Sequence, residues 1–72
     1  MNTFGARLKE LRKQHSISQR EMGEYLGITT RAYQYYEEGK RYPDFEGLIA
    51  LADYFKVSLD YLVGRSDDPT LR

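Results

Sequence analysis

The chain has 72 residues, 11 Lys and Arg against 11 Asp and Glu, a formal net charge of zero, and no cysteine. This length suits one domain with a small core. The lack of cysteine excludes disulfides, thiolate metal sites and a cysteine nucleophile. No apolar run approaches the roughly 18 residues of a membrane-spanning helix, and there is no signal-peptide pattern. We therefore expect a soluble, cytoplasmic protein that makes no membrane contact.

Charge is divided unevenly along the chain. Residues 1–41 contain eight Lys and Arg against five acids, and residues 42–72 contain three against six, so the two parts carry +3 and −3. A generic polyanion binder usually has a strong overall basic excess, which is absent here. The basic part is the candidate surface for an anionic partner.

The first predicted helix covers residues 4–14. Thr3 is a suitable N-cap residue. Phe4, Leu8 and Leu11 recur with helical spacing and give one apolar stripe.

A second helix is predicted to begin after Ser18, because Glu21 three residues later completes a capping box. Gly27 suits the left-handed position that ends such a helix, since glycine adopts it at no steric cost. Its predicted buried face consists of Met22, Tyr25 and Leu26.

Thr29 is predicted to cap a third helix over residues 30–38, and Gly39 ends it. Tyr33 and Tyr36 lie three residues apart on one side of this helix. We expect that side to pack against the other helices.

Asp44 is predicted to cap a fourth helix, and Pro43 disfavours helix immediately before it. Ser58 caps a short fifth helix over residues 59–63. Residues 65–72 are polar and contain a proline, so we expect a flexible tail. The apolar stripe of the fourth helix consists of Phe45, Leu48, Ile49, Ala52 and Phe55. No stretch alternates like a half-buried strand, so the predicted fold class is all-α with five helices.

The second and third helices form the most informative feature, because only Gly27-Ile28-Thr29 separates them. Helices joined so tightly cross at a steep angle, which makes the third helix project from the domain. Arginine can donate to guanine, and glutamine can pair with adenine. The pattern predicts a helix-turn-helix over residues 19–38 that binds double-stranded DNA; the alternative is an ordinary solvated helix face. The candidate base-contacting residues are Thr30, Arg31, Gln34 and Tyr35.

Three further residues are candidates for contact with DNA phosphates. Gln19 lies in the first turn of the second helix, where backbone N–H groups and the helix dipole favour an anion. Lys40 and Arg41 follow the third helix and are placed to bind the phosphate backbone. The alternatives are a solvated first-turn glutamine and a solubilising basic loop.

A set of positions within residues 7–64 also matches a known family. They are Arg12, Ser18, Gln19, Gly27, Glu37, Gly39, Lys40, Pro43 and the run from Val57 to Gly64. At these positions the chain resembles the Cro/repressor-type helix-turn-helix regulators, the xenobiotic-response-element-like proteins of phages and bacteria. The resemblance implies a compact five-helix, lambda-repressor-like domain with its third helix in the major groove.

The resemblance also assigns roles by position. It implies phosphate contacts for Gln19 and Thr29, whereas Gln34 falls at a more variable position of the family. The chain departs from the family pattern at Gly23, which is commonly alanine, and at Tyr33, which is commonly aliphatic. The implied base contacts are Thr30, Arg31 and Tyr35.

The family further pairs an arginine of the first helix with a glutamate of the third, here Arg12 and Glu37. We expect a buried pair that fixes the third helix to the domain; the alternative is two independent surface charges.

Enzymatic activity is not expected. His15 is the only histidine, with no cysteine or second histidine to complete a metal site, and there is no glycine-rich phosphate loop or nucleophile elbow. We predict no metal, no cofactor and no small-molecule ligand.

The sequence therefore predicts a DNA-binding domain over residues 1–64 that acts as a transcriptional regulator, most simply a repressor. One such helix contacts few base pairs, so we expect a homodimer on a near-palindromic operator. Two rival functions remain: an antitoxin-like or partner-regulated interaction module, and the DNA-binding domain of a larger repressor. The expected dimer interface consists of Leu59, Tyr61 and Val63.

Overall fold

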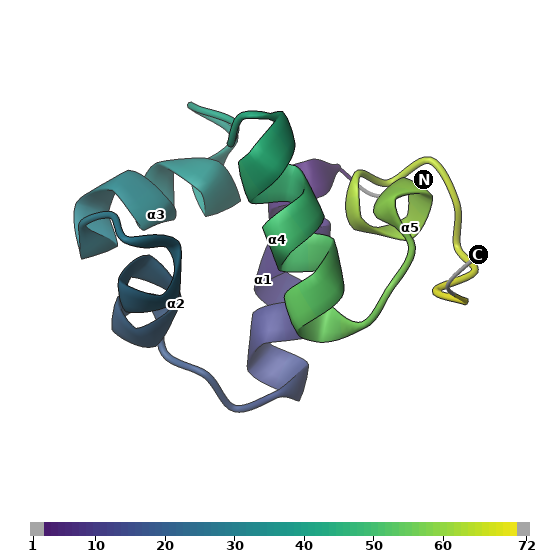
Figure 1. The fold of residues 1–72 in the computed structure, drawn as a ribbon, viewed down its shortest axis with the longest axis horizontal. Helices are drawn as coiled ribbons and strands as arrows, with labels where there is room; N and C mark the ends of the chain where they lie inside the picture. The colour runs from purple at the N-terminus through teal and green to yellow at the C-terminus, as the bar shows by residue number, and fades with distance from the viewer. Residues whose placement is uncertain (1–2, 71–72) are drawn as a thin grey trace.

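The structure, a computed structural model, describes residues 3–70, which form five helices and no strands. In Figure 1 the helices α1 and α4 occupy the centre of the view, with α2 and α3 on one side and α5 on the other. The Cα atoms span 30 × 23 × 20 Å. The helices are α1 (Phe4–Gln14), α2 (Gln19–Leu26), α3 (Thr30–Glu38), α4 (Phe45–Phe55) and α5 (Leu59–Leu62). The predicted all-α, five-helix fold class is confirmed.

Each helix begins at the predicted capping residue. The side-chain oxygens of Thr3, Ser18, Thr29, Asp44 and Ser58 each accept a hydrogen bond from a backbone N–H three residues later. At α2 the Glu21 side chain also accepts from the backbone of Ser18, which completes the predicted capping box. The helix α5 ends one residue earlier than predicted, because Val63 is its C-cap.

The core is built from the apolar faces of all five helices. Phe4, Leu8 and Leu11 are buried as predicted, and Tyr33 is fully buried with Tyr36 packed beside the core. The predicted burial of Tyr25 is wrong, because its side chain is 47% exposed. Two residues of the apolar stripe of α4 are also exposed, Phe45 at 72% and Ile49 at 36%. Tyr25 instead lies on the surface with its ring centroid 4.4 Å from that of Tyr54.

Close backbone contact places α3 against α1. A Cβ atom on Gly5 would lie 2.5 Å from the Glu37 carbonyl oxygen and 2.9 Å from that of Tyr36. Only glycine fits at this crossing, which explains why the first turn of α1 contains a residue with low helix propensity. The position of α3 relative to the domain therefore depends on Gly5.

Residues 65–70, expected as a flexible tail, make contacts with the domain that the sequence did not predict. The Ser58 backbone N–H donates to the Pro69 carbonyl at 3.0 Å, and that of Arg65 donates to the Asp60 carbonyl at 2.8 Å. Leu71 and Arg72 lie outside the described residues. No helix within residues 3–70 is long and apolar enough to cross a membrane.

Candidate nucleic-acid interface

The turn between α2 and α3 is as tight as the sequence predicts. Gly27 ends α2 in the left-handed region, with φ of 71°. A Cβ atom on Gly23 would lie 3.1 Å from the Ile28 carbonyl oxygen and 3.2 Å from that of Thr29. The turn therefore passes directly over α2, and a methyl group at this position would already be in tight contact with the turn backbone.

The outer face of α3 presents the four residues that the sequence selected. Arg31 is exposed, whereas Thr30, Gln34 and Tyr35 are half-buried. The opposite face carries the fully buried Tyr33. The helix thus has one face in the core and one face of polar and aromatic groups directed away from it.

Three cations surround the ring of Tyr35. The Arg31 and Arg41 guanidinium carbons lie 5.2 and 5.0 Å from the ring centroid, and the Lys40 ammonium lies 5.9 Å from it. Arg31 also donates through Nε to the Tyr35 hydroxyl at 3.4 Å, and this bond together with the surrounding positive charge lowers the pKa of Tyr35. The end of α3 and the following loop therefore form a local positive surface suited to an anion.

Arg12 and Glu37 form a bidentate pair that joins α1 to α3. Arg12 Nε donates to Glu37 Oε2 at 2.6 Å and Nη2 donates to Oε1 at 3.2 Å, with the side chains 11% and 5% exposed. Tyr33 donates its hydroxyl to the same carboxylate. Arg12 also donates through Nη1 to the Ile17 carbonyl at 3.0 Å. This arrangement gives the hydroxyl of Tyr33, a departure from the family pattern, the partner that a buried phenol requires.

Burial alone would raise the pKa of the Glu37 carboxyl. The hydrogen bonds from Arg12, Tyr33 and Gln19 outweigh burial and hold that pKa below its usual value. Burial and the bond to Glu37 raise the pKa of Tyr33. At neutral pH Glu37 is therefore a carboxylate and Tyr33 a neutral donor.

Gln19 and Gln34 are brought together, which the sequence did not predict. Gln34 Nε2 donates to Gln19 Oε1 at 3.0 Å, and Gln19 Nε2 donates to Glu37 Oε1 at 3.2 Å. A continuous series of hydrogen bonds thus joins Arg12 of α1 to Glu37 of α3, then to Gln19 at the start of α2, and finally to Gln34 on the outer face of α3.

The remaining phosphate candidates lie at the two ends of α3. Thr29 is exposed, and its hydroxyl oxygen accepts from the Ala32 backbone at 3.0 Å, which leaves its proton for another acceptor. Lys40 is exposed and lies 3.3 Å from a Glu38 oxygen. Arg41 is exposed beside Tyr35.

Arg7 is a second buried cation, and its structural role was not predicted from the sequence. Its side chain is 3% exposed and its guanidinium lies 3.7 Å from the Tyr61 ring centroid. It donates to the carbonyls of Tyr61 and Ser66 at 3.1 and 3.4 Å and to the Asp67 carboxylate at 3.1 Å. A signal was present: residues 4, 7, 8 and 11 follow the helical stripe, so position 7 faces the core.

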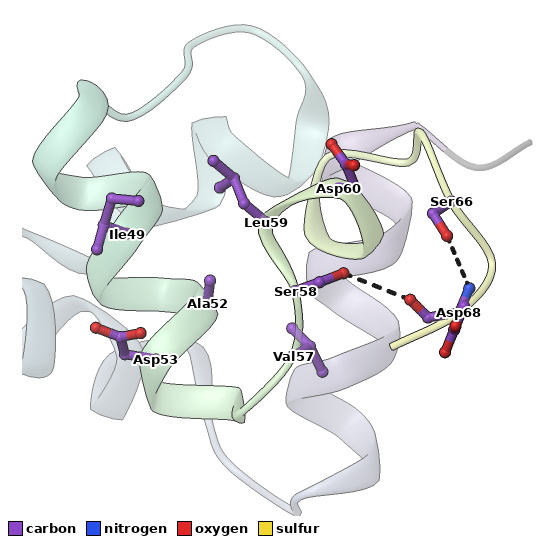
Figure 2. Close-up of a pocket in the computed structure, with 9 residues that line it drawn as sticks. All are labelled: Ile49, Ala52, Asp53, Val57, Ser58, Leu59, Asp60, Ser66 and Asp68. Atoms are coloured by element: carbon purple, nitrogen blue, oxygen red, sulfur yellow. Dashed lines mark hydrogen bonds between the residues drawn. The ribbon is translucent and has the colours of Figure 1, made fainter. Parts of the chain in front are cut away.

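The three predicted interface residues on or directly after α5 are partly buried within their own domain. Leu59, Tyr61 and Val63 all pack against the core cluster. Leu59 also lines a groove of about 520 Å³ between α4, α5 and the C-terminal segment, together with Ile49. Figure 2 shows this groove, with Asp68 hydrogen-bonded to Ser58 and Ser66 along one side. The groove is mixed in character: its apolar residues include Ile49 and Leu59, and its polar residues include Asp53, Asp60 and Asp68.

The only histidine of the chain ends α1. His15 is its C-cap, with Nδ1 2.9 Å from the Leu11 carbonyl and its ring 5.2 Å from that of Phe55. Within residues 3–70 no three His, Asp or Glu side chains are grouped to hold a metal ion.

The helical order, the tight turn and the polar outer face of α3 define a helix-turn-helix domain. The family described as "Helix-turn-helix" matches residues 8–62, so the chain belongs to this family of DNA-binding transcriptional regulators, which are not enzymes. The predicted Cro/repressor-type family is confirmed.

Individual relatives agree with this assignment. The chain is 46% identical over 66 residues to the HTH-type transcriptional regulator YqaE of Bacillus subtilis (strain 168), covering 90% of this chain and 57% of YqaE. It spans little more than half the length of the curated relatives it matches.

Solved structures share the fold. A transcriptional regulator from Listeria innocua is 42% identical with a TM-score of 0.83, covering 86% of this chain and 58% of that one. The P22 c2 repressor, solved in complex with a synthetic operator, is 29% identical with a TM-score of 0.81, covering 92% of this chain and 100% of that one.

Proposed function

We propose that this protein is a sequence-specific DNA-binding transcriptional regulator, a repressor, that places α3 in the major groove of its operator. The observation that carries the proposal is the outer face of α3, where the exposed Arg31 lies beside the half-buried Tyr35, with Lys40 and Arg41 around the same ring. Thr30, Arg31, Gln34 and Tyr35 face the base edges in this arrangement, and Gln19, Thr29, Lys40 and Arg41 face the phosphates. Among its structural relatives, the P22 c2 repressor was solved with an operator. Such a function places the protein in the cytoplasm, where bacterial DNA lies.

The two sides of α3 suit different tasks in this proposal. The bidentate Arg12–Glu37 pair and the close contact at Gly5 hold the inner side to α1. The outer side is then presented by a rigid element, and contact with bases requires this precision. An antitoxin-like module would need a surface for a protein partner, and no observation at α3 favours one over DNA.

We further propose that the active species is a homodimer that binds a near-palindromic site. Two copies related by a twofold axis would place their recognition helices about 34 Å apart, one turn of DNA. Leu59, Tyr61 and Val63 lie on or directly after α5. Leu59 lines an open groove of mixed polar and apolar residues together with Ile49, which is 36% exposed. The apolar side chains of Leu59 and Ile49 support an isologous contact at this groove.

Selection of bound sequences from a random duplex pool tests the DNA-binding function. We expect a short motif present twice with inverted symmetry and a spacing of one helical turn. The same selection with Arg31→Ala should lose preference at one position of each half-site. Failure of the wild-type protein to enrich any sequence would contradict the proposal.

Sedimentation with and without the selected duplex tests the dimer. Leu59→Asp should weaken self-association and cooperative binding, whereas Phe45→Ser, which changes an exposed side chain outside α5, should leave both unchanged. A complex of one monomer with the full site would contradict the dimer.

A further inference from the structure

We propose that Gln34 contacts DNA as a hydrogen-bond acceptor, through Oε1, and that Glu37 imposes this orientation through Gln19. The ligand is the exocyclic amino group of an adenine or a cytosine in the major groove. This inference rests on the proposed DNA-binding function and specifies which kind of base group, a hydrogen-bond donor, is recognised at one position. It also makes Gln19 a positioning residue in addition to a phosphate contact.

Glu37 determines the orientation of the Gln19 amide group. An amide side chain has an oxygen and a nitrogen of the same shape, so its hydrogen-bond partners decide which way it points. An ionised carboxylate only accepts hydrogen bonds. Glu37, with a side chain 5% exposed and paired with Arg12, must therefore face the Nε2 group of Gln19, which lies 3.2 Å from Glu37 Oε1.

The same orientation passes on to Gln34. Once Gln19 turns its nitrogen toward Glu37, its oxygen points to α3 and can only accept. Gln34 must donate to it through Nε2, and the distance is 3.0 Å. The Gln34 carbonyl oxygen is then on the side of the amide away from Gln19, and it accepts no hydrogen bond from another residue within the range 3–70.

This leaves an acceptor on the outer face of α3. Gln34 lies three residues after Arg31 and next to Tyr35, within the group proposed to face the bases. In the major groove adenine N6 and cytosine N4 are donors, whereas guanine O6 and thymine O4 are acceptors. An outward carbonyl oxygen matches the first pair. A glutamine free to rotate would bind either kind equally well.

Base analogues test this polarity. The operator is first selected with the wild-type protein, and the base pair at which Gln34→Ala relaxes preference is identified. At that pair, one duplex replaces the amino base by an analogue that lacks the amino group, which is purine for adenine or 2-pyrimidinone for cytosine. A second duplex removes the partner's carbonyl oxygen, for example with 2-aminopurine in place of guanine.

Loss of the amino group should lower the affinity of the wild-type protein for the duplex about 2- to 10-fold, the effect of one hydrogen bond. It should have no further effect in Gln34→Ala, because the acceptor is already gone. Loss of the carbonyl oxygen should change the affinity of the wild-type protein and of Gln34→Ala for the duplex by the same factor. If the carbonyl oxygen rather than the amino group is coupled to Gln34, or if Gln34→Ala relaxes no position, the inference is wrong while DNA binding stands.

Gln19→Leu tests the positioning role separately from any phosphate contact. Loss of a phosphate contact weakens all duplexes alike, whereas loss of orientation brings the effect of removing the amino group to within about 2-fold of its effect in Gln34→Ala. Gln14→Leu, an exposed glutamine of α1 outside the series, is the matched control and should keep the full discrimination. Full discrimination in Gln19→Leu would overturn the positioning role. A wild-type protein that selects no sequence would remove the proposed function, and this inference with it.

Discussion

Removal of the Arg12 side chain should destabilise the fold more than any change to a surface charge. Arg12→Ala leaves the Glu37 carboxylate, 5% exposed, with only two neutral donors, Tyr33 and Gln19. It also removes the donor to the Ile17 carbonyl. Breaking a buried pair by removing one partner costs about 3–5 kcal/mol. A domain of this size has a total stability of roughly 4–11 kcal/mol, so the loss would be a large share of it.

A double-mutant cycle measured by urea unfolding separates the pair from its surroundings. Arg12→Ala and Glu37→Ala together should cost less than the sum of the single variants, because the second substitution removes the unpaired charge that the first creates. Arg20→Ala is the matched control: its pair with Glu24 is 4.0 Å apart, with side chains 80% and 66% exposed, and should be worth well under about 1 kcal/mol. A loss below about 1 kcal/mol for Arg12→Ala would refute the reasoning, because the pair would then behave as a surface pair.

Three other predictions concern the scaffold. Because the pKa of Glu37 is lower in the folded protein than its usual value of 4.5, the carboxylate stabilises the fold at pH values above 4.5. This stability is lost as the pH falls through the pKa of the folded state, so Glu37→Gln should flatten the acid limb of a stability–pH profile. An equally steep loss in that variant would assign the acid limb to other carboxyls. Gly5→Ala should cost about 1–3 kcal/mol in a thermal melt, because its methyl group would overlap the α3 backbone. Gly23→Ala, with a shortest contact of 3.1 Å, should be nearly neutral, and equal effects of the two variants would argue against the close crossing at Gly5. Arg7→Ala should cost about 1–3 kcal/mol, because it removes a buried side chain that donates to the Tyr61 and Ser66 carbonyls and leaves the Ser66 carbonyl without that donor. Asp67→Ala, 87% exposed, should cost under about 1 kcal/mol; urea melts that reverse this order would contradict the geometry.

Much of the fold could be predicted from the sequence because its helix ends are marked by chemistry. A Ser, Thr or Asp side chain precedes each helix, and Gly27 and Gly39 follow two of them in the left-handed conformation. These interactions are local, so they can be recognised from residues three or four positions apart.

Burial was predicted less well, because spacing identifies a face but not what covers it. Phe45 lies on the apolar stripe of α4 but in its first turn, and is 72% exposed, whereas Leu51 outside the proposed stripe is fully buried. Tyr25 has the spacing of a core residue and packs on the surface against Tyr54. Which neighbour lies over a helix turn depends on the crossing of helices, and that is a tertiary property.

The candidate site was predicted as a set of residues but not as a network. The sequence places Gln19 and Gln34 on different helices, 15 residues apart, and no local rule connects them. The order Glu37, Gln19, Gln34 depends on the angle between α2 and α3, which the turn at Gly27 and the close approach at Gly23 determine. Likewise, the convergence of Arg31, Lys40 and Arg41 on Tyr35 arises only once the loop after α3 folds back.

The most direct test of the central claim compares two arginines of the same surface. Arg31 lies in the first turn of α3, and Arg41 lies beyond its end, each about 5 Å from the Tyr35 ring. Binding of the operator and of a scrambled duplex is titrated at several salt concentrations for both alanine variants. Arg31→Ala should cost about 1–3 kcal/mol per half-site on the operator and little on the scrambled duplex. Arg41→Ala should weaken both alike and reduce the slope of log K against log salt by about one. Equal losses on both duplexes for Arg31→Ala would contradict the account, because Arg31 would then act only through its charge.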